Sequence, residues 1–211
     1  MKLPLNHLWQ TARVSSRDLV VVLHGRGDSS HGFEWLQSEI AIDSLNFLLL
    51  DAPNSYFTGF SWYDLPPRQL PGILESRRLL AKVFAETAAN GFPPQNTFLF
   101  GFSQGCLLTL EFGARHTDRL AGYIGISGYC YDPEALLREM NPEVNTGDWL
   151  ITHGTHDELL PVENTRAQIN RLKQGGFDID FREYRKDHSV DFDRELPEIR
   201  SWMKQRLLHK L

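Results

Sequence analysis

The sequence predicts an α/β fold in which a mostly parallel central sheet is covered by helices on both faces. Short apolar runs rich in β-branched residues alternate with longer segments of helical period, which is the pattern of strand and helix units that build such a sheet. The chain has 211 residues, of which 41% are hydrophobic and 23% are charged. Because one core can serve a chain of this length, we expect a single domain over residues 1–211.

Six runs are candidate strands. Each is too short and too uniformly apolar for a surface hairpin, which favours strands inside a covered sheet. They span Asp18–Leu23, Asn46–Asp51, Thr97–Gly101, Gly122–Ser127, Trp149–His153 and Ile179–Tyr184.

The segments between the strands predict amphipathic helices, because apolar residues recur on one helical face. A third helix, Gln104–Arg115, is apolar on nearly every side, so we expect it deep in the structure. The two amphipathic faces comprise Ile73, Leu80, Phe84 and Ala88, and then Phe192, Leu196, Ile199 and Met203.

The segment Asn54–Pro71 has neither a helical nor a strand period. Loops of this length in compact domains are usually functional or disordered, and its five aromatic residues indicate order. The aromatics favour an apolar pocket and a packed loop core equally.

Charge and apolar patterning exclude several classes of protein. The 22 Lys and Arg against 27 Asp and Glu give 22 − 27 = −5, so no basic excess points to nucleic acid. No apolar run approaches the ~20 residues of a spanning helix, and the first residues lack the pattern of a secretory signal. We expect a cytoplasmic protein in which Cys106 and Cys130 are buried small hydrophobes.

The motif Gly101-Phe102-Ser103-Gln104-Gly105 points to nucleophilic catalysis because it stands between an apolar strand and the buried helix. A serine on a sharp turn from strand to helix is held in a strained conformation with its hydroxyl exposed. The same turn directs the Gln104 N–H, at the helix N-terminus, toward a developing oxyanion.

The serine needs a base, and His188 is the candidate because it follows the last predicted strand, at the edge where α/β sites form. Asp157, just after Trp149–Thr152, is the candidate third member and gives the chain order Ser, Asp, His. The competing carboxylates are Glu158, Asp187 and Asp191. We expect His7, His31, His116 and His209 to be solvated.

A second oxyanion donor is expected from Leu23-His24-Gly25-Arg26-Gly27-Asp28, in the backbone N–H of Arg26. The side chain of Arg26 is either a solvated surface charge or a contact for an acidic leaving group. His24, His153, His156, Asp157 and His188 have no metal-binding spacing, so no metal or other cofactor is expected, and His24 and His153 are expected to support loops.

Several ordered motifs together resemble the acyl-protein thioesterase, carboxylesterase and lysophospholipase group of small α/β-hydrolases. The Ser-Trp-Tyr-Asp stretch, for example, is similar to the family's Ser-Trp-Phe-Asp element. The matching segments are Leu23–Asp28, Ser61–Asp64, Gly101–Gly105, His153–Pro161 and His188–Val190.

The resemblance implies an α/β-hydrolase fold with a minimal lid and a triad of Ser103, Asp157 and His188. It implies an oxyanion hole from Arg26 and Gln104. It also implies an acyl channel near the Phe57–Leu65 loop, with Phe57, Phe60, Trp62 and Leu65 as substrate-binding candidates and Trp62 also structural.

The chain departs from the family at two positions. Arg26 stands where the family has a bulky apolar residue, and Asp187 stands where it has glycine before the histidine. A charged rim argues against a purely lipid-like substrate. Asp187 either favours the imidazolium or points into water.

Two functions are weighed. The first is a serine hydrolase that cleaves carboxylic esters or thioesters, small or protein-linked, through an acyl-enzyme, as a monomer or homodimer. The alternative is a non-catalytic ligand-binding or scaffold protein on the same fold. A lipase or peptidase with a large lid is disfavoured because only one short loop could form a cap.

Overall fold

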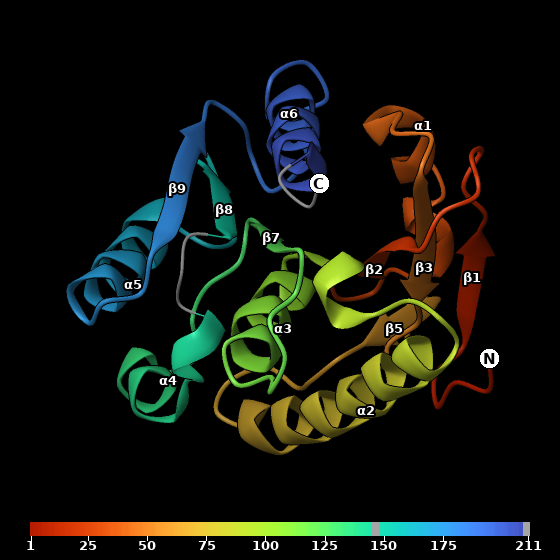
Figure 1. Cartoon of the computed structure of the whole chain (residues 1–211). Coiled ribbons are helices and arrows are strands. Elements are labelled where there is room, and N and C mark those ends of the chain that lie inside the picture. Colours follow the sequence, from red (N-terminus) through yellow and green to blue (C-terminus); the bar gives the residue numbers. More distant parts are fainter. Residues whose placement is uncertain (145–147, 209–211) are drawn as a thin grey trace.

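Seven strands form the central sheet of the computed structural model, which describes residues 1–144 and 148–208. Their order is β1-β3-β2-β6-β7-β8-β9, and every neighbouring pair is parallel except β1 and β3 (Figure 1). The strands are β1 (His7–Gln10), β2 (Asp18–Leu23), β3 (Leu45–Leu50), β6 (Thr97–Phe102), β7 (Gly122–Ile126), β8 (Trp149–Gly154) and β9 (Ile179–Tyr184).

All six predicted strands are present, with ends that differ by at most one residue. The prediction missed β1, which pairs antiparallel with β3 at the edge of the sheet. This strand is four residues long and its residues are exposed or only half-buried, so it carries none of the uniform apolar character of the central strands.

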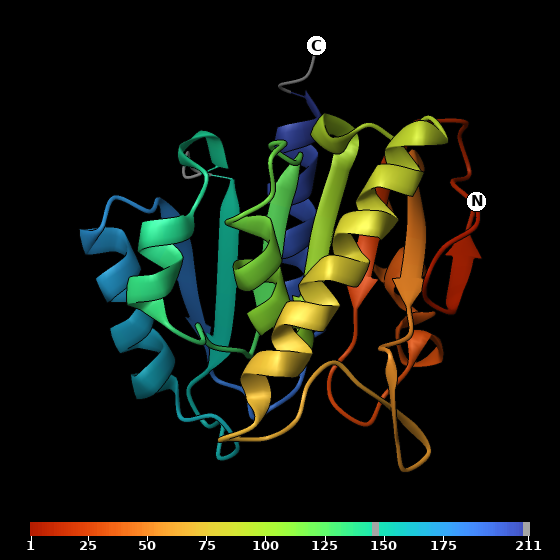
Figure 2. The same ribbon diagram turned by 90° about the horizontal axis from the view of Figure 1, so that it is seen from below.

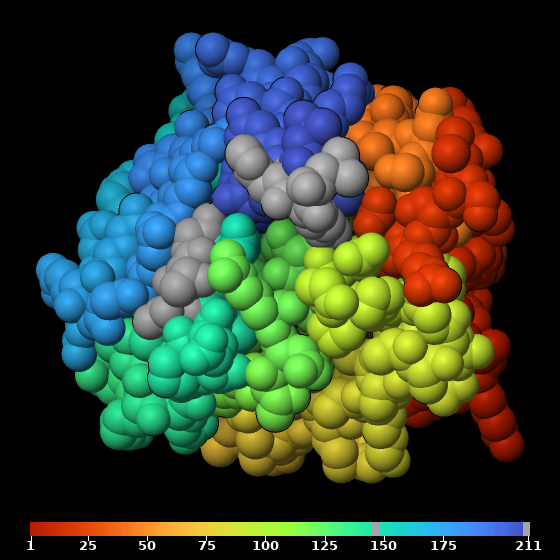
Figure 3. Space-filling view, viewed as in Figure 1, coloured from red at the N-terminus to blue at the C-terminus, as the bar shows by residue number. Residues whose placement is uncertain are grey.

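Helices cover both faces of the sheet, as predicted. On one face lie α2 (Gln69–Ala89), α3 (Gln104–Gly113), α4 (Pro133–Glu139) and α5 (Val162–Gln174), and on the other lie α1 (Leu36–Ile40) and α6 (Glu195–Leu208). Helix α6 packs beside α1, although the two are far apart in the chain, and the space-filling view shows the blue and orange segments meeting at the surface (Figure 3). Three short 3-10 turns cover Ser30–Phe33, Pro94–Asn96 and Pro142–Val144.

The core is divided by the sheet into two clusters. The helices α2 to α5 pack over alternate residues of the strands, such as Val21, Leu99 and Ile151, while α1 and α6 pack over Val20 and Phe100 on the other face. Helix α3 is buried along its whole length, as its composition predicted. It therefore holds the turn before it in a fixed position.

The segment Asn54–Pro71 contains regular structure that its sequence did not reveal. It forms a hairpin of β4 (Asn54–Tyr56) and β5 (Gly59–Ser61), and its last residues already belong to α2. The hairpin is held to the loop after β2, because Gly27 N donates to Phe60 O and Phe60 N donates to Asp28 O, both at 2.8 Å. In Figure 2 this hairpin projects at the edge where the carboxyl ends of the parallel strands lie.

Phe192 corrects the predicted last helix. Leu196, Ile199 and Met203 form the buried face of α6, but Phe192 precedes the helix, is about half exposed and packs on Trp35 with ring centroids 4.7 Å apart. The helix begins later because Asp191 accepts hydrogen bonds from the N–H groups of the two residues at positions 193 and 194.

Candidate active site

Ser103 lies on the turn between β6 and α3. Its backbone has φ 54° and ψ −111°, a conformation that residues with a Cβ rarely adopt. Close contacts explain the two glycines of the motif: a Cβ on Gly101 would lie 2.2 Å from the Gly105 carbonyl oxygen, and one on Gly105 would lie 2.1 Å from that of Leu23. The strained turn that the motif predicts is therefore present.

The side chains of Ser103, His188 and Asp157 form one chain of hydrogen bonds. His188 Nε2 lies 2.9 Å from Ser103 Oγ, and His188 Nδ1 lies 2.7 Å from Asp157 Oδ2. The Asp157 side chain is fully buried, and its Oδ1 accepts from the N–H groups of Leu159 at 3.1 Å and Leu160 at 2.8 Å. These two donors fix the carboxylate, and its other oxygen, Oδ2, faces His188 Nδ1 and, at 3.3 Å, His153 Nε2.

The three competing carboxylates lie away from the imidazole nitrogens. Asp187 is exposed, and its carboxylate accepts a hydrogen bond from Ser189 Oγ. Of the two roles considered for Asp187, a contact that favours the imidazolium or a side chain that points into water, the structure therefore shows the second. Asp191 caps the turn before α6, and Glu158 is exposed.

Two backbone N–H groups beside the nucleophile are free to act as oxyanion donors. A Cβ on Gly25 would lie 3.4 Å from Ser103 Cβ, so the backbone leading to Arg26 passes next to the serine. Within residues 1–144 and 148–208, the Arg26 N–H has no hydrogen-bond acceptor. Gln104 is the first residue of α3, where no carbonyl of the helix accepts the N–H.

The Gln104 side chain has a second role that the sequence did not suggest. Its Oε1 accepts from Trp62 N at 2.9 Å, and its Nε2 donates to Tyr63 O at 2.7 Å. The Trp62 indole in turn donates to His24 O at 2.9 Å. This buried network joins the turn at Ser103, the start of the oxyanion loop and the segment after the hairpin.

A cavity of about 470 Å³ opens over Ser103 and His188. Of the four substrate-binding candidates, Leu65 lines this cavity, whereas Phe57 is 90% exposed, Phe60 packs against the core and Trp62 is completely buried. Trp62 is therefore corrected to a structural role. Tyr56 and Tyr63, two of the five aromatics for which the sequence left a pocket and a packed loop core open, line this cavity. The sequence missed several further lining residues, because only the folded chain brings them to the serine: Phe102, Tyr129, Leu159 and Leu160.

His24 and His153 support loops, as expected. Ala52 N donates to His24 Nε2 at 3.1 Å, and His153 Nε2 lies 2.8 Å from Leu160 O. Burial lowers the pKa of both imidazoles below the ordinary value. Among the residues that the structure describes, no group of three or more His, Cys, Asp or Glu is placed to hold a metal ion.

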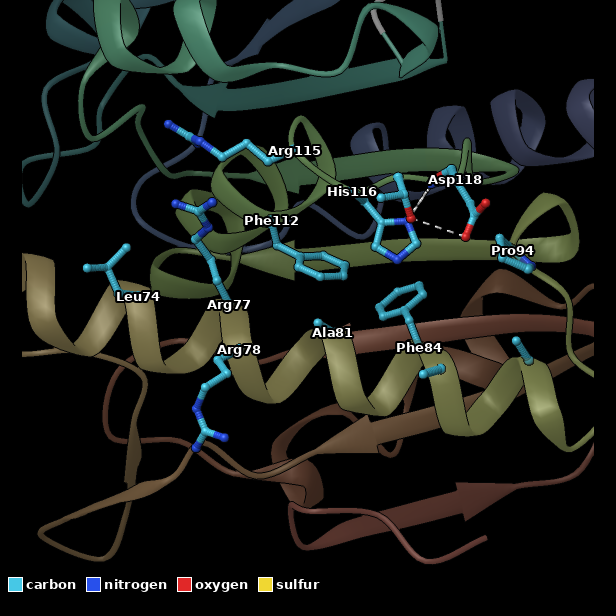
Figure 4. Close-up of a pocket in the computed structure, with 13 residues that line it drawn as sticks. Leu74, Arg77, Arg78, Ala81, Phe84, Pro94, Phe112, Arg115, His116 and Asp118 are labelled. Carbon is cyan, nitrogen blue, oxygen red and sulfur yellow. Dashed lines mark hydrogen bonds between the residues drawn. The ribbon is translucent and has the colours of Figure 1, made fainter.

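A separate cavity of about 490 Å³ lies between α2 and the end of α3 (Figure 4). The prediction that His116 is solvated is wrong. Its ring packs against two phenylalanines, with ring centroids 5.5 Å from Phe84 and 4.9 Å from Phe112. His7 and His31 are exposed as expected, and His209 lies outside the described residues. This cavity shares no lining residue with the one over Ser103.

The cysteines follow their prediction. Cys106 and Cys130 are both free and buried, and burial raises the pKa of the Cys106 thiol to about 12. No helix within the described part of the chain combines the length and the apolar character that crossing a membrane requires.

Known proteins that are similar to this chain include carboxylesterases and acyl-protein thioesterases. Residues 9–206 match the model of a family described as phospholipase/carboxylesterase. Acyl-protein thioesterase 1 of Yarrowia lipolytica is 28% identical over 93% of this chain and 95% of its own, and carboxylesterase SOBER1 of Arabidopsis thaliana is 29% identical over 91% and 92%. The crystal structure of SOBER1 has a TM-score of 0.82 at 27% identity, covering 92% of this chain and 100% of the other. The expected α/β-hydrolase fold is thereby confirmed.

Proposed function

Because this chain belongs to the phospholipase/carboxylesterase family, we propose that it hydrolyses carboxylic esters and thioesters with Ser103 as nucleophile, His188 as base and Asp157 as the group that orients His188. The observation that carries this assignment is the hydrogen-bonded chain from Asp157 through His188 to Ser103. Relatives named acyl-protein thioesterase and carboxylesterase support both ester and thioester hydrolysis. They give no support to a non-catalytic binding or scaffold protein.

In the acylation step, Ser103 Oγ attacks the carbonyl carbon while His188 Nε2 takes the hydroxyl proton. The N–H groups of Arg26 and Gln104 stabilise the negative charge that develops on the carbonyl oxygen. His188 then gives its proton to the leaving alcohol or thiol as the bond to carbon breaks, and an acyl-enzyme remains. The buried Asp157 carboxylate stabilises the imidazolium throughout.

In the deacylation step, water takes the place of the leaving group. His188 accepts a proton from the water as its oxygen attacks the acyl carbon, and the proton returns to Ser103 Oγ when the carboxylic acid is released. The same donors serve both steps.

The wall of the cavity supports an acyl substrate with an apolar chain. Leu65, Tyr129 and Leu160 line the cavity over Ser103 and also line a neighbouring hollow of about 580 Å³ that runs toward α5. An acyl chain laid along this wall buries apolar surface. Rates on p-nitrophenyl esters from acetate to palmitate measure how long a chain this wall accepts. Comparison of hydrolysis rates on a lysophospholipid and on an S-acyl peptide decides whether the protein also has lysophospholipase activity.

Labelling with a fluorophosphonate tests the nucleophile directly. We expect the folded wild-type protein to be labelled at pH 8 and the peptide that contains Ser103 to carry the label. The Ser103→Ala variant, once its circular dichroism spectrum shows that it is folded, should stay unlabelled. Equal labelling of the two proteins, or none of either, contradicts the assignment.

We also propose the cytoplasm as the compartment. The free thiols of Cys106 and Cys130 suit a reducing environment, in which disulfides rarely persist. Fractionation of cells that express the full chain with an epitope tag tests this, and recovery in a secreted or membrane fraction contradicts it.

A further inference from the structure

Arg26 places a positive charge in the wall of the cavity over Ser103. The residue is half-buried, and its guanidinium carbon lies 4.1 Å from the centre of the Tyr56 ring. Its Nε is buried and has no hydrogen-bond partner. The stacking on Tyr56 limits the motion of the guanidinium but leaves its charge uncompensated.

No carboxylate pairs with Arg26 among residues 1–144 and 148–208. Arg115, another partly buried arginine, is paired with Glu111 at 2.8 Å and Glu139 at 2.7 Å, whereas Arg77 and Arg200 have no carboxylate within 4.0 Å among the described residues. A half-buried cation without an anion is costly. Arg26 differs from Arg77 and Arg200 because it lines the same cavity as Ser103 and His188, where a bound substrate can supply the anion.

Asp28, the acidic residue among the described residues that line the cavity, is engaged elsewhere. Its Oδ1 accepts from Ser29 N at 2.8 Å, and its carboxylate lies against Gly32, where a Cβ would meet Oδ1 at 2.1 Å. Arg26 is the one Lys or Arg among the described residues that line this cavity, so the positive charge is local.

The lining of the cavity over Ser103 therefore has an apolar end and a charged end. Leu65, Tyr129 and Leu160 form the apolar end, which continues into the hollow beside α5. Arg26 and Tyr56 form the charged end, on the loop after β2 and the hairpin. Because the apolar end suits the acyl chain, the charged end is the part of the lining that remains for the leaving group.

We propose that Arg26 binds a carboxylate or phosphate in the leaving group, so that the preferred substrates are acyl esters or thioesters with an anionic group close to the scissile bond. This inference rests on the proposed hydrolase function and adds the substrate class. A guanidinium suits the task because it can donate two parallel hydrogen bonds to either anion.

Paired substrates that differ by one anionic group test the proposal. The carboxylate pair is 4-nitro-3-(octanoyloxy)benzoate and its primary amide, and the phosphate pair is 1-octanoylglycerol 3-phosphate and 1-octanoylglycerol. We expect kcat/KM of the wild-type protein to favour the anionic member of at least one pair by about tenfold or more, as for a charge-assisted hydrogen bond. Comparison of the two pairs identifies carboxylate or phosphate as the preferred anion.

The readout is the anionic-to-neutral ratio within each variant, because the Arg26 backbone lies next to the nucleophile and its substitution can change absolute rates. Arg26→Gln should bring the ratio close to one, and Arg26→Lys should restore part of it. Lys204→Gln, which removes the same charge from the exposed face of α6, should keep the wild-type ratio. A wild-type ratio near one in both pairs, or a ratio that survives Arg26→Gln, overturns the proposal.

Equilibrium binding separates this proposal from the proposed function. The Ser103→Ala variant cannot turn over substrate, so calorimetry on it gives the dissociation constants of 1-octanoylglycerol 3-phosphate and 1-octanoylglycerol directly. Tighter binding of the phosphate, lost in Ser103→Ala/Arg26→Gln, supports the anion site even if hydrolysis fails. Equal binding of the two, together with equal hydrolysis of the carboxylate pair, overturns the anion site and leaves the hydrolase function standing.

Discussion

Lys186 and Glu195 form a buried ion pair, with Nζ 2.7 Å from Oε2, at the base of the loop that carries His188. Lys186 Nζ also donates to Ser189 O at 2.7 Å, and Glu195 Oε2 accepts from Asp191 N at 3.0 Å. The pair therefore ties both sides of this loop to the start of α6. Burial lowers the pKa of Lys186, and the charge of Glu195 partly opposes that shift.

Lys186→Met should destabilise the protein by about 3–5 kcal/mol, because it leaves the Glu195 carboxylate buried without its partner. Urea denaturation measures the change. The kcat of the remaining folded protein should also fall, since the His188 loop loses its anchor.

The double variant Lys186→Met/Glu195→Leu is the matched control, because it removes both charges. It should recover most of the lost free energy of unfolding. A double variant that is no more stable than Lys186→Met would show that the loss comes from packing and not from the unpaired charge.

Asp157→Asn should lower kcat by roughly 10³- to 10⁴-fold while leaving the fold intact, because an amide cannot hold the imidazole tautomer that accepts the serine proton. Asp187→Asn is the control, since that carboxylate is exposed and bonded to Ser189 Oγ. Its kcat should stay within about twofold of the wild type. The reverse result, a large loss in Asp187→Asn and none in Asp157→Asn, means that the acid is wrongly assigned.

The parts of the fold that the sequence predicted are those in which burial dominates. Strand β2 has the predicted bounds because it is a central parallel strand with a uniformly apolar, buried run after Asp18. Strand β9 also has the predicted bounds, although it lies at the edge of the sheet and only its first and last residues are buried. Strand β1 and the hairpin of β4 and β5 were missed because short, exposed strands are held by backbone hydrogen bonds to partners distant in sequence. The bonds of Gly27 and Phe60 are an example.

The candidate site divides in the same way. Ser103, Asp157 and His188 could be predicted because each follows a strand in a parallel sheet, and such strand ends meet at one edge. The side-chain bonds of Gln104 and the lining by Tyr129 could not, because they depend on how distant loops pack. The role of Trp62 was ambiguous for a related reason, since an aromatic residue in the core and one that lines a pocket look the same in the sequence.

Gln104→Met should destabilise the protein by about 1–3 kcal/mol, because at nearly unchanged volume it leaves the Trp62 N–H buried without a partner and leaves the Tyr63 carbonyl only its bond from Ser61 Oγ. Urea denaturation measures this as well. Gln205→Met, an exposed change in α6, should shift the free energy of unfolding by no more than about 0.5 kcal/mol. Equal stability of the two variants would contradict a structural role for the Gln104 amide.

The free energy of unfolding should fall as the pH is lowered from 7.5 to 5.5. Burial lowers the pKa of His24 and His153 in the native state, while in the unfolded chain both titrate near 6.5. The unfolded state therefore binds more protons below that pH, and acid favours it by up to about 1.4 kcal/mol per pH unit for each histidine. Urea denaturation across this range gives the slope.

Variants separate these two histidines from the other titrating groups. His24→Gln and His153→Gln cannot take up the proton, so each should lose part of the slope whatever its absolute stability. Gln205→Met is the control, because this exposed change in α6 removes no titrating group and should keep the wild-type slope. If neither His24→Gln nor His153→Gln flattens the pH dependence of the free energy of unfolding more than the control does, the two histidines carry their proton in the native state. The inference that burial removes their charge is then wrong.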